Sequence, residues 1–250
     1  MNVVIVGATF GIGFEVAKKF LDHCDNLIII GRTQAKLDSI KSELVSKNTK
    51  VLTLSMDVTN INQVKETMSR ILNNVSSIDM FIYSSGHYEP HGSFDIDLDL
   101  FKKTFDVNFF GFINCLSVIL GHMKNKKHGH IAVLSSLAGF GGLPNSSSYG
   151  PSKSAIMNYC ESIKIDCDKH NIDLTVINPG FVRSRLTDKN EFSMPFLMDA
   201  DKAAEIIYEG LIDKKYEITF PLPMKILFKI LRILPRPIYF FVVKILTKNF

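Results

Sequence analysis

The chain has few cysteines and shows no metal-ligand pattern. Its four cysteines, Cys24, Cys115, Cys160 and Cys167, form neither a CxxC pair nor the spacing of a zinc site. Cys115 and Cys160 stand in apolar, helical surroundings, which is typical of small buried hydrophobic residues. We therefore predict no disulfide framework, no bound metal and a reducing compartment such as the cytoplasm.

Linkers, internal repeats and low-complexity segments are also missing, which excludes repeat architectures and tethered domains. The first apolar run starts at Asn2, so we expect no signal peptide. No uncharged stretch reaches the ~18–20 apolar residues that a spanning helix requires. The basic residues cover too little area, with too few interleaved aromatics, for a nucleic-acid partner.

Short apolar runs alternate with helical patterns along the 250 residues, of which 46% are hydrophobic. Runs bounded by turn residues are typical of strands buried on both faces, and their alternation with helices predicts a parallel sheet covered on both sides. The chain is long enough to bury this core as one domain. The strand candidates are residues 2–6, 27–30, 51–56, 80–83, 131–134 and 174–177.

A glycine-rich turn, with Gly7, Gly11 and Gly13, joins the first strand to a helical pattern. A strand, a glycine turn and a helix start together suit a pyrophosphate, because free N–H groups and the helix dipole attract the anion. The spacing is GxxxGxG and not the common GxGxxG. Glycines that only permit a tight turn are an equally good explanation at this point.

The second strand ends in Gly31-Arg32-Thr33. In dinucleotide sites an acid near this position binds the ribose 2′-hydroxyl, whereas an arginine accommodates a 2′-phosphate. Gly31 supplies no acid and the guanidinium of Arg32 suits phosphate, although a solvated arginine is the alternative. We predict that NADP(H) is favoured over NAD(H), even though Phe10 in the glycine turn adds no second cation.

Tyr149 and Lys153 are four residues apart and would share one face of a helix. An ammonium near a phenol favours the phenolate, so we expect a lowered tyrosine pKa and general acid–base chemistry. Ser136 follows the apolar run 131–134, which places a hydroxyl at the carboxyl end of a buried strand. Ligands bind at that end in open α/β sheets.

In this order and spacing, the motifs of about residues 1–220 resemble those of the short-chain dehydrogenase/reductase family. Asp57-Val58, Asn108 and Pro179-Gly180 complete the match. The resemblance implies an α/β Rossmann-like doubly wound sheet of seven parallel strands, the last at 216–220. It further implies a catalytic NAD(P)-binding domain over residues 1–220, extended by a helical tail over residues 221–250.

The resemblance also implies roles for single residues. Tyr149 would be the catalytic acid/base, and Lys153 would bind the nicotinamide ribose and lower the tyrosine pKa. Ser136 would orient the substrate oxygen, Asn108 would support a proton relay, and Asp57 would contact the adenine. The implied cofactor contacts are Gly7, Thr9, Phe10, Gly11, Ile12, Gly13, Arg32, Asp57, Val58, Ser84, Ser85, Gly86, Tyr149, Lys153, Pro179, Gly180, Val182 and Ser184.

One segment departs from the family pattern. The usual Asn-Asn-Ala-Gly after the fourth strand reads Tyr83-Ser84-Ser85-Gly86. Gly86 keeps the backbone open to a cofactor, but the asparagine contacts must be replaced. This departure is the one observation that favours an alternative from another class, a cofactor-binding sensor or scaffold with little turnover.

Residues 218–250 are apolar and contain no acid. Such a segment, interrupted by Pro235 and Pro237, suits a helix pair lying in a membrane interface. Packing over the substrate cleft or across a homodimer explains the same pattern, because amphipathicity alone does not separate these cases. The tail cations are Lys225, Lys229, Arg232, Arg236, Lys244 and Lys248.

The stretch 181–198 occupies the variable substrate loop of the family and is rich in Phe, Leu and Met. An apolar lining favours an apolar ligand, although a surface helix packing its own face would look similar. His87 and His91, after the fourth strand, are either substrate contacts or solvated loop residues. We predict a hydride-transferring oxidoreductase that acts on a small lipid-like carbonyl or secondary alcohol.

Overall fold

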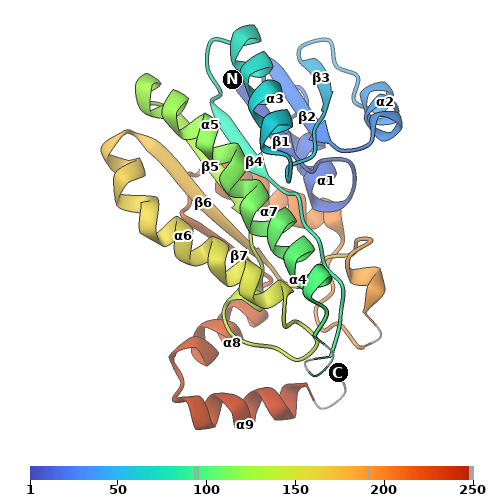
Figure 1. Cartoon of the computed structure of the whole chain (residues 1–250), viewed down its shortest axis with the longest axis vertical. Helices are drawn as coiled ribbons and strands as arrows, with labels where there is room; N and C mark the ends of the chain where they lie inside the picture. The colour runs from blue at the N-terminus through green and yellow to red at the C-terminus, as the bar shows by residue number, and fades with distance from the viewer. Residues whose placement is uncertain (93, 95, 191, 248–250) are drawn as a thin grey trace.

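The computed structural model describes residues 1–92, 94, 96–190 and 192–247. Seven strands form one parallel sheet in the order β3-β2-β1-β4-β5-β6-β7 (Figure 1). The predicted α/β fold with a seven-stranded parallel sheet is confirmed. The strands are β1 (Asn2–Val6), β2 (Asn26–Gly31), β3 (Lys50–Ser55), β4 (Met80–Tyr83), β5 (Gly129–Leu134), β6 (Ile172–Pro179) and β7 (Glu217–Phe220).

Helices cover both faces of the sheet (Figure 1). A π-helix, η1 (Asp106–Phe110), joins α4 to α5, and the 3₁₀-helices η2 (Leu137–Gly139) and η3 (Thr187–Lys189) lie in loops. The α-helices of the described residues are α1 (Gly11–Phe20), α2 (Gln34–Glu43), α3 (Ile61–Asn74), α4 (Leu98–Phe105), α5 (Gly111–Lys126), α6 (Tyr149–Lys169), α7 (Ala200–Ile212), α8 (Leu222–Ile233) and α9 (Arg236–Leu246).

The core has two layers because successive strand residues point to opposite faces. Val4 and Val6 of β1 belong to the cluster formed with α3, α5 and α6. Val3 and Ile5 belong to the cluster formed with α1, α2 and α7. All four side chains are buried, which explains why the strands read as continuous apolar runs in the sequence.

The four cysteines are free and buried. Cys115 and Cys160 are fully buried in the core, as the sequence predicted. Burial raises the pKa of Cys115 and of Cys160 to about 12. Both thiols therefore stay protonated and act as apolar packing groups.

One helix, Leu98–Lys126, is long and apolar enough to cross a membrane when judged by length and composition alone. The core helices of globular proteins meet the same test, so this is weak evidence. Phe112, Leu116 and Ile119 of this helix are buried against the sheet. The core therefore accounts for these three apolar residues, whereas Leu98 and Phe110 of the same helix are exposed.

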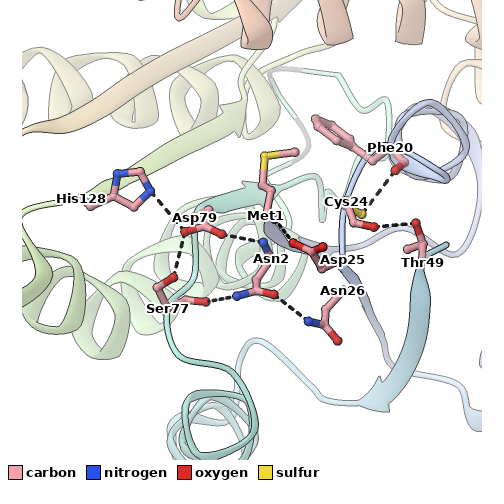
Figure 2. A network of polar contacts seen from close by, with 10 residues as sticks. All are labelled: Met1, Asn2, Phe20, Cys24, Asp25, Asn26, Thr49, Ser77, Asp79 and His128. Carbon is pink, nitrogen blue, oxygen red and sulfur yellow. Dashed lines mark hydrogen bonds and ion pairs between the residues drawn. The ribbon is translucent and has the colours of Figure 1, made fainter.

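Polar contacts hold the amino-terminal ends of the strands (Figure 2). The backbone N–H of Asn2 donates to the Asp79 carboxylate at 2.7 Å, and the Asn2 side chain donates to the Ser77 carbonyl at 2.9 Å. The Asn26 side chain donates to Asn2 Oδ1 at 2.7 Å. This network joins the starts of β1, β2 and β4 at the edge opposite their carboxyl ends.

The carboxyl edge contains the point where the strand order reverses. The chain runs outward from β1 to β3 and then returns to β4 on the other side of β1. In open α/β sheets a ligand binds outside the strand ends at such a point. Gly7 follows β1 and Ser84 follows β4, so the sheet brings two predicted cofactor segments together.

Candidate active site

The glycine-rich turn packs tightly against the segment that follows β4. Gly7 has φ +84°, a conformation that favours glycine. A Cβ on Gly7 would lie 2.4 Å from the Ser85 backbone nitrogen, and one on Gly13 would lie 2.7 Å from Ser84 Oγ. Both glycines are thus needed for the close approach of the two segments, whether or not a ligand binds.

Gly11, at φ +59°, opens the turn toward a cavity of about 170 Å³. The N-cap residue of α1, Phe10, forms no side-chain cap, so the first N–H groups of the helix remain for an anion. This arrangement fits a pyrophosphate. The predicted contacts that line the cavity are Gly7, Thr9, Phe10, Gly11, Ile12, Arg32, Val58, Ser84, Ser85, Gly86 and Ser184.

A second cation, Lys36, lines the same cavity beside Arg32, and the sequence analysis missed it. Lys36 Nζ lies 5.8 Å from the centroid of the Phe10 ring, and the Arg185 guanidinium lies 4.9 Å from it. Phe10 itself supplies no charge, as noted from the sequence, but it stands between two cations. The position of Lys36, four residues after Arg32 at a helix start, was the available signal.

The end of β2 has no room for an acidic side chain. A Cβ on Gly31 would lie 2.3 Å from the Thr9 methyl carbon. An aspartate or glutamate at position 31 would therefore displace Thr9 from the wall of the cavity. The glycine thus keeps this part of the site free of negative charge.

A second cavity, of about 110 Å³, contains the predicted catalytic hydroxyls. Leu186 lines both cavities, so they adjoin. Tyr149 and Ser136 meet in the second cavity, together with Pro179 and Gly180. Its other lining residues are Tyr88, Leu137, Ala138, Leu143, Pro144, Ser146, Phe181, Thr187, Asn190, Phe192, Met224 and Phe228.

Tyr149 is the first residue of α6, and Lys153 lies one turn later. Lys153 Nζ is 5.6 Å from the centroid of the Tyr149 ring and donates to the Leu134 carbonyl at 2.7 Å. Ser136 is the N-cap residue of η2, and its Oγ accepts from the Ala138 N–H at 3.1 Å. The carboxyl end of β5 and the start of α6 thus bring Ser136, Tyr149 and Lys153 together.

The predicted fall in the tyrosine pKa is wrong for the protein alone. Burial raises the pKa of Tyr149 to about 12, although a side-chain hydrogen bond with Ser136 acts to lower it. Burial also lowers the pKa of Lys153 to about 7. Desolvation disfavours the charged form of each group, and it is the largest cause of both pKa shifts.

Asn108 is fully buried in the π-helix η1. Its Oδ1 accepts from the His87 N–H at 2.7 Å, and its Nδ2 donates to the His87 carbonyl at 3.0 Å and to Ser152 Oγ at 2.9 Å. Among the described residues, its hydrogen bonds therefore reach α6 through Ser152 and not through Lys153. The support of a proton relay that the family resemblance implies for Asn108 stays a prediction.

Three further predicted residues lie outside the walls of both cavities. Asp57 Oδ1 accepts from the N–H and hydroxyl of Thr59 at 2.9 and 2.8 Å. Val182 is buried and pairs with Met198 in an isolated bridge. Gly13 packs beneath the turn. Their predicted contacts with a cofactor remain predictions.

The unusual segment after β4 has its own packing. Tyr83 is fully buried, and its hydroxyl donates to the Val107 carbonyl of η1 at 2.5 Å. A Cβ on Gly111 would lie 2.4 Å from this hydroxyl, so the end of η1 fits closely around it. Tyr83 thereby fastens η1 to β4, a contact that the sequence did not reveal.

The loop histidines serve the structure. His87 Nδ1 hydrogen-bonds with Thr104 Oγ1 at 3.2 Å, and His91 Nε2 hydrogen-bonds with Ser147 Oγ at 2.7 Å. Neither ring lines the cavity that contains Tyr149. Besides Lys36, the sequence analysis missed Tyr88, whose ring lies 5.0 Å from that of Tyr149 in an edge-on arrangement.

Known proteins provide an independent comparison. Residues 1–193 match the family model described as short chain dehydrogenase. The chain is 28% identical over 238 residues to a Myxococcus xanthus (strain DK1622) protein named uncharacterized oxidoreductase, covering 95% of this chain and 94% of that one. It is 27% identical over 258 residues to the Bos taurus dehydrogenase/reductase SDR family member 7B, covering 95% and 78%.

The structural comparison agrees with the sequence comparison. The structure described as ElxO with NADP bound superimposes with a TM-score of 0.78 at 25% identity. The match covers 87% of this chain and 96% of the ElxO chain. The sheet and its surrounding helices are therefore shared over most of both molecules.

Proposed function

Because the chain belongs to the short-chain dehydrogenase family of NAD(P)-dependent oxidoreductases, we propose that it reduces the carbonyl group of an apolar, lipid-like substrate with NADPH. One observation carries the proposal. Tyr149 and Ser136 line a largely apolar cavity that adjoins, through Leu186, the glycine-lined cavity at the ends of β1 and β4. A proton donor and a glycine-lined cleft are thus neighbours.

Each group of the site has a role in this reaction. A bound nicotinamide would supply the hydride that the carbonyl carbon receives. Ser136 would hold the carbonyl oxygen, and Tyr149 would donate the proton to it. The raised pKa of Tyr149 keeps the phenol protonated at neutral pH, which suits its use as an acid. Lys153, whose pKa lies at about 7, would exchange protons with its surroundings near neutrality.

The proposed preference for NADPH rests on charge. Arg32 and Lys36 line the cavity at the end of β2, where a 2′-phosphate would lie. Thr9 occupies the space that an acidic side chain at position 31 would need. The NADP-bound state of the ElxO structure supports the same choice.

The apolar character of the substrate is inferred from the side chains that line the cavity together with Tyr149. Phe181 and Phe192 come from the loop after β6, and Met224 and Phe228 come from α8. Such side chains favour an apolar ligand because burying it removes apolar surface from water. The sensor or scaffold alternative loses its one support, since Tyr83 has a packing role of its own.

The test is a screen of NADPH oxidation with carbonyl compounds of increasing apolar chain length. We expect Tyr149→Phe to lose at least ~10²-fold in kcat, the scale of proton-transfer catalysis, while its NADPH dissociation constant stays unchanged. Tyr159→Phe on the same helix is the matched control, because Tyr159 lines neither cavity. Undiminished turnover of Tyr149→Phe, or faster turnover of short polar carbonyls than of apolar ones, would contradict the proposal.

A further inference from the structure

The surface of α8 and α9 carries an unusual amount of exposed apolar side chain. Of the 19 large apolar residues exposed in the described part of the chain, nine lie between residues 222 and 246. On α8 the exposed residues Leu222, Ile226, Ile230 and Ile233 are spaced by four, four and three, which forms one stripe along the helix. Ile233 is 80% exposed.

This stripe is not a core face. Met224, Phe228 and Leu231 of α8 are buried on the opposite side, where they contact the body of the molecule. A helix that is apolar on both sides is ordinarily buried in a protein core or in lipid. The outward stripe therefore lacks a partner in the described chain.

Helix α9 repeats the pattern. Tyr239 and Val243 are buried, whereas Ile238, Phe241 and Ile245 form an exposed stripe with spacings of three and four. The two helices are 12 and 11 residues long, too short to span a bilayer of ~20 helical residues. They lie at one end of the molecule, and α9 is the element farthest from the sheet (Figure 1).

The charges beside these stripes are basic. No acid occurs from residue 218 to the end of the chain, and Lys248 lies outside the described residues. Lys229 pairs with Glu217 at 2.9 Å and Arg232 with Glu161 at 3.3 Å. Lys225, Arg236 and Lys244 take part in none of the ion pairs between described residues. A two-fold dimer through this face would place like charges opposite each other, whereas an anionic surface would attract them.

A third cavity lies between the α8–α9 pair and the cavity that contains Tyr149. It has a volume of about 290 Å³ and lies between α8, α9 and the loop at Ser193–Phe196. Leu143, Phe181, Met224 and Phe228 line both this cavity and the one that contains Tyr149. The two cavities therefore adjoin at an apolar wall, beneath the helix pair that carries the exposed stripes.

We propose that the α8–α9 pair docks on an anionic lipid bilayer and that the 290 Å³ cavity admits apolar substrate from the bilayer to Tyr149. The exposed stripes enter the acyl boundary, and the cations contact lipid headgroups. The second part, substrate admission, rests on the proposed reductase function. The first part, docking, does not.

Docking is tested by sedimenting the full chain with vesicles of phosphatidylcholine alone or mixed with an equal part of phosphatidylglycerol. We expect binding to the mixed vesicles that weakens at high salt and falls at least ~10-fold in the double variant Ile226→Ser, Phe241→Ser. Ile165→Ser, at a 69% exposed position on α6, is the matched control and should bind like the unaltered protein.

Docking would be overturned if the unaltered chain stayed in the soluble fraction equally with the mixed vesicles and with phosphatidylcholine vesicles. It would also be overturned by a double variant that converts a dimer to a monomer in light scattering but keeps its vesicle binding, because the face would then belong to a second copy. In either case the reductase assay on soluble carbonyls is unaffected, since Ile226 and Phe241 line none of the three cavities. The experiments can therefore contradict membrane docking without contradicting the proposed reductase function.

Substrate admission is tested with one long-chain ketone held in the mixed vesicles and one short water-soluble ketone. The double variant should lose at least ~10-fold in turnover of the vesicle-held ketone, in step with its lost binding, and none with the soluble ketone. Unchanged turnover of the vesicle-held ketone would overturn the route. Inactivity of the unaltered chain on all carbonyls would overturn both the route and the proposed function, while the sedimentation result would stand.

Discussion

Burial determines the proton affinity of the two central residues more than their mutual attraction does. Between about pH 7 and pH 12 both Tyr149 and Lys153 are neutral in the protein alone. The ammonium that was expected to stabilise a phenolate is directed at the Leu134 carbonyl instead. Spacing along a helix gave the proximity of the pair correctly, but it contains no information about desolvation.

The lowered pKa of Lys153 predicts how stability changes with pH. The amine titrates at about 7 in the folded protein and at about 10.5 when unfolded. Between these values the unfolded chain binds more protons, so stability rises with pH. Relative to Lys153→Met, the free energy of unfolding should increase by up to ~1.4 kcal/mol per pH unit above about pH 7.

Urea unfolding of the protein and of Lys153→Met, measured without cofactor at several pH values, provides the comparison. Subtracting the two series removes the other titrating groups. If the difference in the free energy of unfolding between the two proteins does not change from about pH 7 to pH 9, Lys153 keeps its ordinary pKa and stays charged in the folded protein.

Cofactor choice is also argued at the scale of single residues. Removing one of two cations that face a 2′-phosphate costs a charge-assisted hydrogen bond, so Arg32→Ala and Lys36→Ala should each weaken NADPH binding by about tenfold or more. The NADH dissociation constant should hardly change. Calorimetric titration measures both dissociation constants, and Lys65→Ala on α3 is the surface control. Equal losses of affinity for NADPH and NADH would refute the assignment of Arg32 and Lys36 to the 2′-phosphate.

At the scale of elements, the sequence predicted the strands best. The runs at 2–6 and 80–83 coincide with β1 and β4 because strands buried on both faces contain almost only apolar residues. The sequence did not predict the π-helix Asp106–Phe110, since an inserted residue in a helix leaves no change of composition. Asn108 lies within this π-helix, so its contacts could be found only from the structure.

One hydrogen bond adds to the apolar packing that holds α9 against the rest of the chain. The Tyr239 hydroxyl donates to the Gly142 carbonyl at 2.6 Å, and a Cβ on Gly141 would lie 2.6 Å from the same hydroxyl. We expect Tyr239→Phe to loosen α9 by about 1 kcal/mol, because the carbonyl loses its donor. Hydrogen exchange should then show faster exchange in α9 and no change in α6. Tyr208→Phe on α7 is the control, and unaltered protection of α9 would mean that apolar packing alone holds the helix.

At the scale of the whole molecule, the two cavities draw on different parts of the chain. The glycine-lined cavity is lined only by residues between Val6 and Leu186. The reaction cavity adds Met224 and Phe228 from α8, which also packs closely on Gly180. The proposed division into a binding and catalytic unit over 1–220 and a helical extension over 221–250 follows this difference.

Truncation after Phe220 tests the division. The sheet keeps all seven strands, so we expect the shortened chain to bind NADPH with an unchanged dissociation constant. Loss of Met224 and Phe228 opens the apolar wall, and KM for apolar carbonyls should rise by about tenfold or more. Stability should fall as well, because three buried side chains of α8 are removed.

Phe228→Ala in the full chain distinguishes loss of the apolar cavity wall from loss of the fold. With α8 and α9 still in place, this variant should also raise KM for apolar carbonyls. Circular dichroism identifies whether the shortened chain is folded. If the chain of 220 residues is folded but no longer binds NADPH, the tail belongs to the nucleotide-binding unit. In that case α8 would be needed to hold Gly180 and the end of β6 against the cofactor cleft.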